Sequence, residues 1–268
     1  MKKYFITAFA LLCVAITACK KSTQNPKPIN TEPTCKLTSI LLGAGGTAPG
    51  TENLTYDAQG RLVKDSIGTQ PYNFSYAGNK ITITTGNIVI ELTLENGRVI
   101  NYSDNTGATE PIAYNSDGYI STVSYYQDGA LFATDARTYT NGNLTGFKQT
   151  PGPGNPSGST LSETFSYDAT KTATSFYIAN PMYYTVPFYI PGLYGKEPKG
   201  LLISFSGTTD YLNSPTDETN HDFTYEQDQA TGNYSTVTQH LTGTRHFAGN
   251  TINVDQTTIF KLTYVCDK

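Results

Sequence analysis

Apolar and polar residues alternate along most of the chain after residue 35. A period of two is typical of β-strands that bury one face, because successive side chains point to opposite sides of a sheet. In the run 88–94, the aliphatic residues Ile88, Ile90, Leu92 and Leu94 share one face. The runs 72–76 and 260–264 place aromatic and aliphatic residues in the same way. The pattern predicts many short strands, each with one apolar face.

Tight-turn signals separate these strands. Seven dipeptides that contain glycine punctuate residues 59–142: Gln59-Gly60, Gly78-Asn79, Gly86-Asn87, Asn96-Gly97, Asp117-Gly118, Asp128-Gly129 and Asn141-Gly142. Gly and Asn adopt the positive φ that short hairpin turns need. About twelve residues per turn leave no room for helices between strands, so consecutive strands are predicted to pair antiparallel.

The turns belong to an internal repeat. The segment Tyr56-Asp57-Ala58-Gln59-Gly60-Arg61-Leu62 is echoed by Tyr114-Asn115-Ser116-Asp117-Gly118-Tyr119-Ile120, and shorter versions begin at residues 76, 94 and 139. The anchors at 56, 76, 94 and 114 are 20, 18 and 20 residues apart, one hairpin per unit. In each unit the anchor packs on the sheet, Asp or Asn starts the turn and Gly closes it.

These patterns predict an all-β fold. We expect an antiparallel meander of successive β-hairpins that forms a long twisted or partly curled sheet, with a closed barrel as the alternative architecture. The expected organisation is a signal peptide over residues 1–18, a lipidated Cys and flexible tether over 19–34, and a single hairpin-repeat domain over 35–268.

The first nineteen residues have the form of an export signal. Met1 to Lys3 supply positive charge, and an apolar stretch of about fourteen residues follows, which is too short for a spanning helix. The stretch ends Ile16-Thr17-Ala18-Cys19, which resembles the bacterial lipobox; an ordinary secretory signal that contains a cysteine is the alternative. The lipobox resemblance implies acylation of Cys19, and so attachment to a membrane by lipid.

The hairpin motif extends this resemblance. Residues Tyr56 to Leu62 match the form Y-D-x-x-G-R-L in full. This form resembles YD-type repeats. It resembles more closely the repeats of a family of uncharacterised bacterial envelope lipoproteins, which has a domain of unknown function. The resemblance covers most of residues 35–266. It implies a lipid-anchored β-sheet domain in the cell envelope of a Gram-negative bacterium, on an outer-membrane anchor with its periplasmic or outward side left open. It implies no activity.

Two cysteines remain for the folded domain. Cys13 leaves with the signal peptide and Cys19 carries lipid, so Cys35 and Cys266 are left at the two ends of the domain, in an oxidising compartment. We predict a disulfide between them; two reduced, buried thiols are the alternative.

Charge and motifs argue against several functions. Lys plus Arg 18 against Asp plus Glu 22 gives a net charge of −4, so we expect no nucleic-acid partner. His221, His240 and His246 lack the tight spacing of zinc ligands, and Asp104 to Gly107 look like a turn rather than a calcium loop. There is no Gly-x-Ser-x-Gly motif. We therefore predict no cofactor, no metal and no enzymatic activity.

An aromatic segment interrupts the hairpin rhythm. Residues 180–198 contain four prolines and five aromatic candidates for ligand contact: Tyr183, Tyr184, Phe188, Tyr189 and Tyr194. They could form a platform for sugar rings, or a cover that packs onto an exposed sheet face. The cover is the favoured interpretation.

Three functions are compatible with these features. The first is a non-enzymatic, lipid-anchored envelope module that presents a β-sheet surface to a protein or glycan. The second is a periplasmic lipid or lipoprotein carrier, which requires an apolar half-barrel cavity. The third is a glycan-active hydrolase, which requires two converging carboxylates from distant strands.

Overall fold

The hairpin domain is the part of the chain that the structure describes. The structure, a computed structural model, describes residues 35–44, 50–67, 70–156, 158–173, 176–186, 190–212, 214–247 and 250–266. Of these described residues, 71% lie in strands and 3% in helices. The predicted signal peptide, Cys19 and the tether lie outside the described residues, and so do Phe188 and Tyr189.

Sixteen strands are described, and they lengthen toward the C-terminus. In chain order they are β1 (Cys35–Ala44), β2 (Gly50–Tyr56), β3 (Leu62–Ile67), β4 (Gln70–Ala77), β5 (Lys80–Thr85), β6 (Ile88–Glu95), β7 (Arg98–Asp104), β8 (Ala108–Tyr114), β9 (Ile120–Gln127), β10 (Ala130–Thr140), β11 (Asn143–Pro151), β12 (Thr160–Thr172), β13 (Gly200–Asp210), β14 (Asp217–Gln227), β15 (Tyr234–Phe247) and β16 (Asn250–Cys266). A short 3₁₀ turn, η1 (Tyr177–Ala179), and a single-turn helix, α1 (Pro181–Thr185), lie between β12 and β13.

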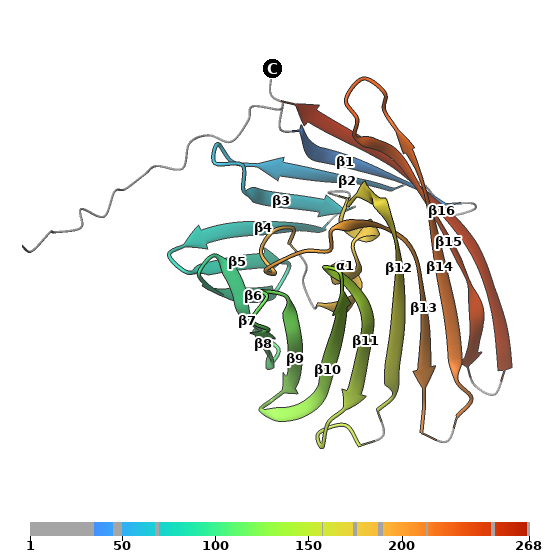
Figure 1. The fold of residues 1–268 in the computed structure, drawn as a ribbon. Helices are drawn as coiled ribbons and strands as arrows, with labels where there is room; N and C mark the ends of the chain where they lie inside the picture. The colour runs from blue at the N-terminus through green and yellow to red at the C-terminus, as the bar shows by residue number, and fades with distance from the viewer. Residues whose placement is uncertain are drawn as a thin grey trace, which may run out of the picture.

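The sheet closes on itself. Each strand pairs antiparallel with the next in sequence, and β1 pairs antiparallel with β16 (Figure 1). The predicted all-β fold of antiparallel hairpins is confirmed. The prediction of an open, twisted or partly curled sheet is wrong, because the two strands that would be its edges satisfy each other's backbone groups from Cys35 opposite Cys266 to Ala44 opposite Thr258.

A disulfide lies at this seam. Cys35 and Cys266 are directly opposite each other in the β1–β16 register, and the structure joins them with their Cα atoms 3.9 Å apart. The crosslink therefore spans 231 positions of sequence and connects the first strand of the barrel to the last.

The repeat has a defined contact between neighbouring units. A tyrosine hydroxyl donates to the backbone carbonyl of the aliphatic residue that restarts the strand in the preceding unit. This occurs for Tyr56 with Leu37 (2.8 Å), Tyr76 with Leu62 (2.7 Å), Tyr114 with Val99 (2.5 Å), Tyr167 with Leu144 (2.8 Å) and Tyr225 with Leu202. Phenylalanine could not make this bond, which explains the use of tyrosine at these five positions.

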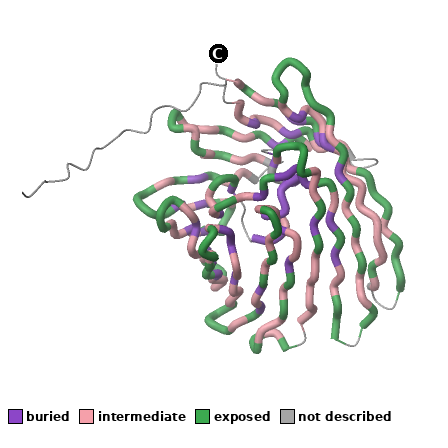
Figure 2. The backbone as a smooth tube through the Cα atoms, viewed as in Figure 1, coloured by how far each residue is buried: buried purple, intermediate pink, exposed green. Residues whose placement is uncertain are grey.

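The buried core consists mainly of apolar side chains that face into the barrel, and the outward face of β14 is polar. On β14, the inward Phe223 and Tyr225 alternate with the outward Glu218, Asn220, Asp222, Thr224 and Glu226. On β16, the inward Phe260 and Leu262 alternate with Ile259, Lys261 and Thr263. Buried positions follow the same alternation along the strands in Figure 2. No helix in the described residues is long and apolar enough to cross a membrane.

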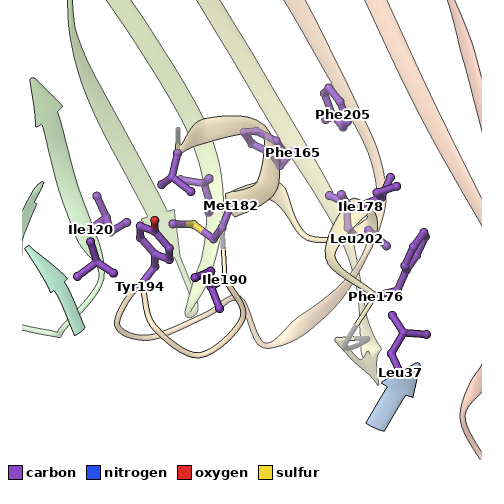
Figure 3. Packing of buried hydrophobic residues seen from close by; sticks show 14 of the residues in the cluster. Leu37, Ile120, Phe165, Phe176, Ile178, Met182, Ile190, Tyr194, Leu202 and Phe205 are labelled. Carbon is purple, nitrogen blue, oxygen red and sulfur yellow. The ribbon is translucent and has the colours of Figure 1, made fainter. Parts of the chain in front are cut away.

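The segment between β12 and β13 fills the middle of the barrel. Figure 1 shows α1 inside the ring of strands. Its N-terminus is capped by Asn180, whose side chain accepts a hydrogen bond from the backbone N–H of Met182 at 3.0 Å. Phe176, Met182 and Tyr194 are buried in the core formed with the barrel wall (Figure 3). We call residues 176–186 and 190–195 the inner segment.

Candidate binding cavity

A cavity of about 910 Å³ lies between the N-terminal strands and the inner segment. It is lined mainly by apolar and aromatic side chains from β1–β6 and from the inner segment. Its lining residues are Cys35, Lys36, Leu37, Leu54, Tyr56, Gly60, Arg61, Leu62, Asp65, Tyr72, Phe74, Tyr76, Gly78, Lys80, Ile81, Leu94, Gly97, Tyr183, Val186, Ile190, Pro191 and Leu193. The cavity is thus inside the barrel and apolar, with a few charged groups.

Repeat tyrosines form part of the cavity wall. Their hydrogen bonds to backbone carbonyls hold Tyr56 and Tyr76 against the strands, so that their rings line the space. Burial, with smaller contributions from Asp65 and Glu52, raises the pKa of Tyr56 to about 12, so its hydroxyl stays protonated and continues to donate.

The mouth of the cavity lies at the hairpin-turn end of β2–β7. Cys35, Gly60, Gly78 and Gly97 belong to this end and line the cavity. Lys36 lies over the ring of Tyr56, with 5.8 Å from Nζ to the ring centroid.

Two further cations at the mouth are paired. Arg61 forms an ion pair with Asp57 at 2.7 Å, and its guanidinium stacks on the ring of Tyr76 at 4.5 Å. Lys80 is paired with Glu91 at 2.8 Å. Both pairs are solvent-exposed, so they contribute little to stability.

An acidic pair lies at the wall of the cavity, and of the two only Asp65 is among the lining residues. Asp65 on β3 is opposite Leu54 on β2 and Tyr72 on β4, and it is hydrogen-bonded to Glu52. Burial raises the pKa of Asp65 to about 6, although the hydrogen bond to Glu52 acts in the opposite direction. Glu52 is 1% exposed. The pair places negative charge beside apolar walls.

On the opposite side of the barrel interior, aromatic rings pack against one another, and the cavity among the C-terminal strands is smaller, about 400 Å³. Tyr184 packs on Phe205, with ring centroids 4.7 Å apart, and Phe205 stacks on His221 at 4.0 Å. Burial, assisted by the charge of Arg245, lowers the pKa of His221 to about 4, so this histidine is neutral at physiological pH. These rings confine the large cavity to the N-terminal side.

A buried ion pair fastens the inner segment to the wall. Arg137 and Asp135 on β10 are 2.5 Å apart with both side chains fully buried. Asp135 also accepts hydrogen bonds from the backbone of Val123 and the hydroxyl of Tyr125. Arg137 donates to the carbonyl of Thr185 at the end of α1.

Two glutamates, the buried Glu110 and the partly buried Glu163, face the same interior. Burial, then the charges of Asp104 and Asp135, raises the pKa of Glu110 to about 8. Burial raises the pKa of Glu163 to about 7 against the opposing charge of Arg137. Both acids therefore hold a proton at or near neutral pH, which avoids isolated negative charge in the core.

The structure separates the aromatic residues predicted as a ligand platform. Tyr183 is 41% exposed and lines the cavity. Tyr184 packs into the aromatic stack, and Tyr194 is fully buried in the core. Phe188 and Tyr189 lie outside the described residues. Of the three that are described, only Tyr183 reaches the cavity.

The three histidines are not brought together. His221 faces inward, while His240 contacts Asp255 at 2.8 Å and His246 contacts Asp217 at 3.2 Å. Within the described residues no group of three His, Cys, Asp or Glu side chains could hold a metal ion. Asp104 closes a turn by accepting hydrogen bonds from Thr106 and Ala108.

The cavity residues that carry charge were not predicted from the sequence. Every second residue of β2 lies on the same face, which holds Glu52, Leu54 and Tyr56. An acidic residue on an otherwise apolar face was therefore the sequence signal that could have identified Glu52. Asp65 had no such signal, because β3 is short and its alternation is weak.

The fold and the cavity together define a closed β-barrel with an apolar interior space. No family model matches the chain, and no curated protein matches it. Among solved structures, a porin-like protein from Bacteroides uniformis is similar at 16% identity, with a TM-score of 0.59, over 88% of this chain and 99% of that chain. A porin-like protein from Bacteroides vulgatus is similar at 14% identity, with a TM-score of 0.55, over 85% and 98%. These similarities show the fold.

Proposed function

We propose that this protein is a non-enzymatic binding barrel of the bacterial envelope, which holds an apolar small molecule in its N-terminal cavity. The cavity carries this proposal. Ligand sites typically enclose about 300–1,000 Å³, with mostly apolar and aromatic walls and a few placed polar groups. The volume of about 910 Å³ and the lining of this cavity match that description. The proposal corresponds to the carrier alternative rather than to a sheet surface or a hydrolase.

The orientation of side chains favours a container over a pore. A transmembrane barrel presents an apolar band to lipid and polar groups to its lumen. Here the outward side chains of β14 are polar, those of β16 include Lys261 and Thr263 beside Ile259, and the inner segment occupies the lumen. Although the two similar structures are described as porin-like, the polar outer face of β14 and the occupied lumen support a container rather than an open pore.

Lipid on Cys19 would hold the barrel at the membrane. Cys35 lines the cavity, so the mouth is at the end of the barrel where the tether joins. Cys19 and Cys35 are sixteen positions apart, and the chain between them spans at most about 55 Å. An apolar molecule could therefore pass between a bilayer and the mouth over a short distance. We expect Cys19→Ser to abolish acyl labelling and release the protein from the membrane fraction; unchanged labelling would contradict the anchor.

Dye binding tests the cavity. The full chain, reconstituted in lipid nanodiscs, is titrated with the neutral apolar dye N-phenyl-1-naphthylamine. We expect saturable binding that Leu54→Trp abolishes, because the indole occupies cavity space. Phe132→Trp is the matched control, since Phe132 is 45% exposed on the outer face of β10. Equal binding by both folded variants, or none by the unaltered chain, would overturn the proposed function.

A further inference from the structure

We propose that the cavity selects apolar molecules whose polar group donates hydrogen bonds, and that it binds an amine most tightly, with the amine against Asp65. This inference rests on the proposed function of the cavity as a binding site, and it names the chemical class of the ligand.

The geometry around Asp65 carries the inference. Asp65 lines the cavity, and its Oδ1 is buried with no hydrogen-bond partner among the described residues. Buried carboxylate oxygens are normally hydrogen-bonded, because leaving one unmatched is costly. Its neighbours across the strands, Leu54 and Tyr72, also line the cavity. A ligand that enters from the mouth and passes the rings of Tyr56 and Tyr76 would bring its far end to the Asp65 side chain, which lines the cavity.

The charges that face Asp65 determine which polar group fits. From β2 it faces Glu52 and Tyr56, from β4 Tyr72, and from the inner segment Tyr183. None of these side chains is a cation. The cations that line the described part of the cavity are Lys36, Arg61 and Lys80 at the mouth, two of them already paired with Asp57 and Glu91.

The order of preference among head groups follows from this charge. A protonated amine supplies both positive charge and N–H donors to the Asp65–Glu52 pair. A hydroxyl supplies one donor and no charge. A carboxylate supplies neither, and it would be repelled by the pair. Because the apolar body is the same in all three cases, the head group alone decides the order amine, alcohol, acid.

A displacement assay with matched chains tests the inference. Decylamine, decanol and decanoate, each below its micellar concentration, displace N-phenyl-1-naphthylamine from the full chain in nanodiscs at pH 7.5. Nanodiscs that carry the Leu54→Trp variant serve as the blank, which corrects for partition of the dye and the probes into the lipid. We expect decylamine to bind about ten- to a hundredfold more tightly than decanoate, with decanol between them.

The Asp65→Asn variant tests the residue itself. It should lose most of the preference for decylamine and leave decanol binding nearly unchanged. Asp255→Asn is the matched control, because it removes one negative charge from a side chain that is 81% exposed on the outer face.

The pH dependence of the unaltered chain is a second test that needs no substitution. The pKa of Asp65 is raised to about 6, so its charge is present above that pH and lost below it. Decylamine affinity should therefore fall as the pH falls through about 6, while decanol affinity stays level. Because a bound amine stabilises the charged form of Asp65, the fall in affinity should begin at that pKa.

The outcomes separate this inference from the proposed function. Equal affinity for the three probes, or full amine preference in a folded Asp65→Asn variant, would overturn the inference and leave the cavity as a binding site. A flat pH profile for decylamine would also overturn it. If the dye itself does not bind the unaltered chain beyond the Leu54→Trp blank, both proposals fail.

Discussion

The two sides of the barrel interior use aromatic residues in opposite ways. On the C-terminal side, Tyr184, Phe205, His221 and Phe223 stack against one another, and the cavity among the C-terminal strands is only about 400 Å³. On the N-terminal side, the tyrosine hydroxyls hydrogen-bond to carbonyls of the wall and the rings line a cavity of about 910 Å³. Aromatic content alone therefore does not fill a barrel. The direction in which each ring is held decides whether the interior is core or binding site.

Charged groups show the same contrast. Arg137 and Asp135 are fully buried and fasten the inner segment, whereas Arg61 and Asp57 form an exposed pair at the cavity mouth. Removing one partner of a buried ion pair strongly lowers the free energy of unfolding, because the other charge stays buried without a partner. Exposed ion pairs contribute little to that free energy. The buried pair on β10 is thus predicted to contribute more to stability than the exposed pair at the cavity mouth.

The largest expected effect is the loss of the buried cation. Arg137→Met should destabilise the protein by about 4 kcal/mol, because it leaves Asp135 buried without its charge partner. Arg61→Met at the mouth should cost less than about 1 kcal/mol. Urea unfolding of both variants followed by circular dichroism measures the difference. Similar losses for the two variants would contradict the contrast between the sides.

The next largest loss of stability is expected from removing a buried aromatic ring. Phe205→Ala should cost about 3 kcal/mol, since Phe205 is 3% exposed and contacts rings on every side. Phe74→Ala should cost less, about 2 kcal/mol, because one side of Phe74 already faces the cavity. The same unfolding measurement ranks the two. A larger loss for Phe74→Ala would show that the N-terminal side is packed as tightly as the C-terminal side.

The smallest effect concerns the repeat tyrosines. Tyr76→Phe should cost about 1 kcal/mol, because the carbonyl of Leu62 loses its hydroxyl donor. Tyr139 is the matched control, since its buried hydroxyl has no hydrogen-bond partner among the described residues. Tyr139→Phe should therefore be neutral or slightly stabilising. Equal effects of the two substitutions on the free energy of unfolding would mean that the hydroxyl bond does not explain the use of tyrosine in the repeat.

The strands and turns follow from the sequence because both are local features. All seven predicted turn dipeptides contain a glycine with positive φ, and Asn96, Asp128 and Asn141 adopt positive φ as well. Alternation along β5 and β6 correctly identifies the buried Ile81, Ile83, Ile90 and Leu92, whereas Ile88, predicted on the same face, is exposed.

Closure and the cavity depend on long-range packing, and the sequence signals for them are weaker. A disulfide between the two ends of a meander already requires its first and last strands to be neighbours, so the prediction of a Cys35–Cys266 pair pointed toward a barrel. The cavity could not be predicted in this way. Alternation places both Tyr76 and Phe205 inside, and it does not tell which ring lies along the wall and which crosses the interior.

Tryptophan fluorescence tests the central claim, an apolar ligand space on the N-terminal side, most directly. The chain contains no tryptophan, so Phe74→Trp and Phe132→Trp each introduce a single reporter, one in the cavity wall and one on the outer face. The full chain in nanodiscs is titrated with 1-bromodecane, whose bromine quenches indole on contact. We expect saturable quenching of the reporter at position 74 and only weak, linear quenching at position 132. Equal, non-saturable quenching at both positions would contradict an apolar ligand space on this side of the barrel.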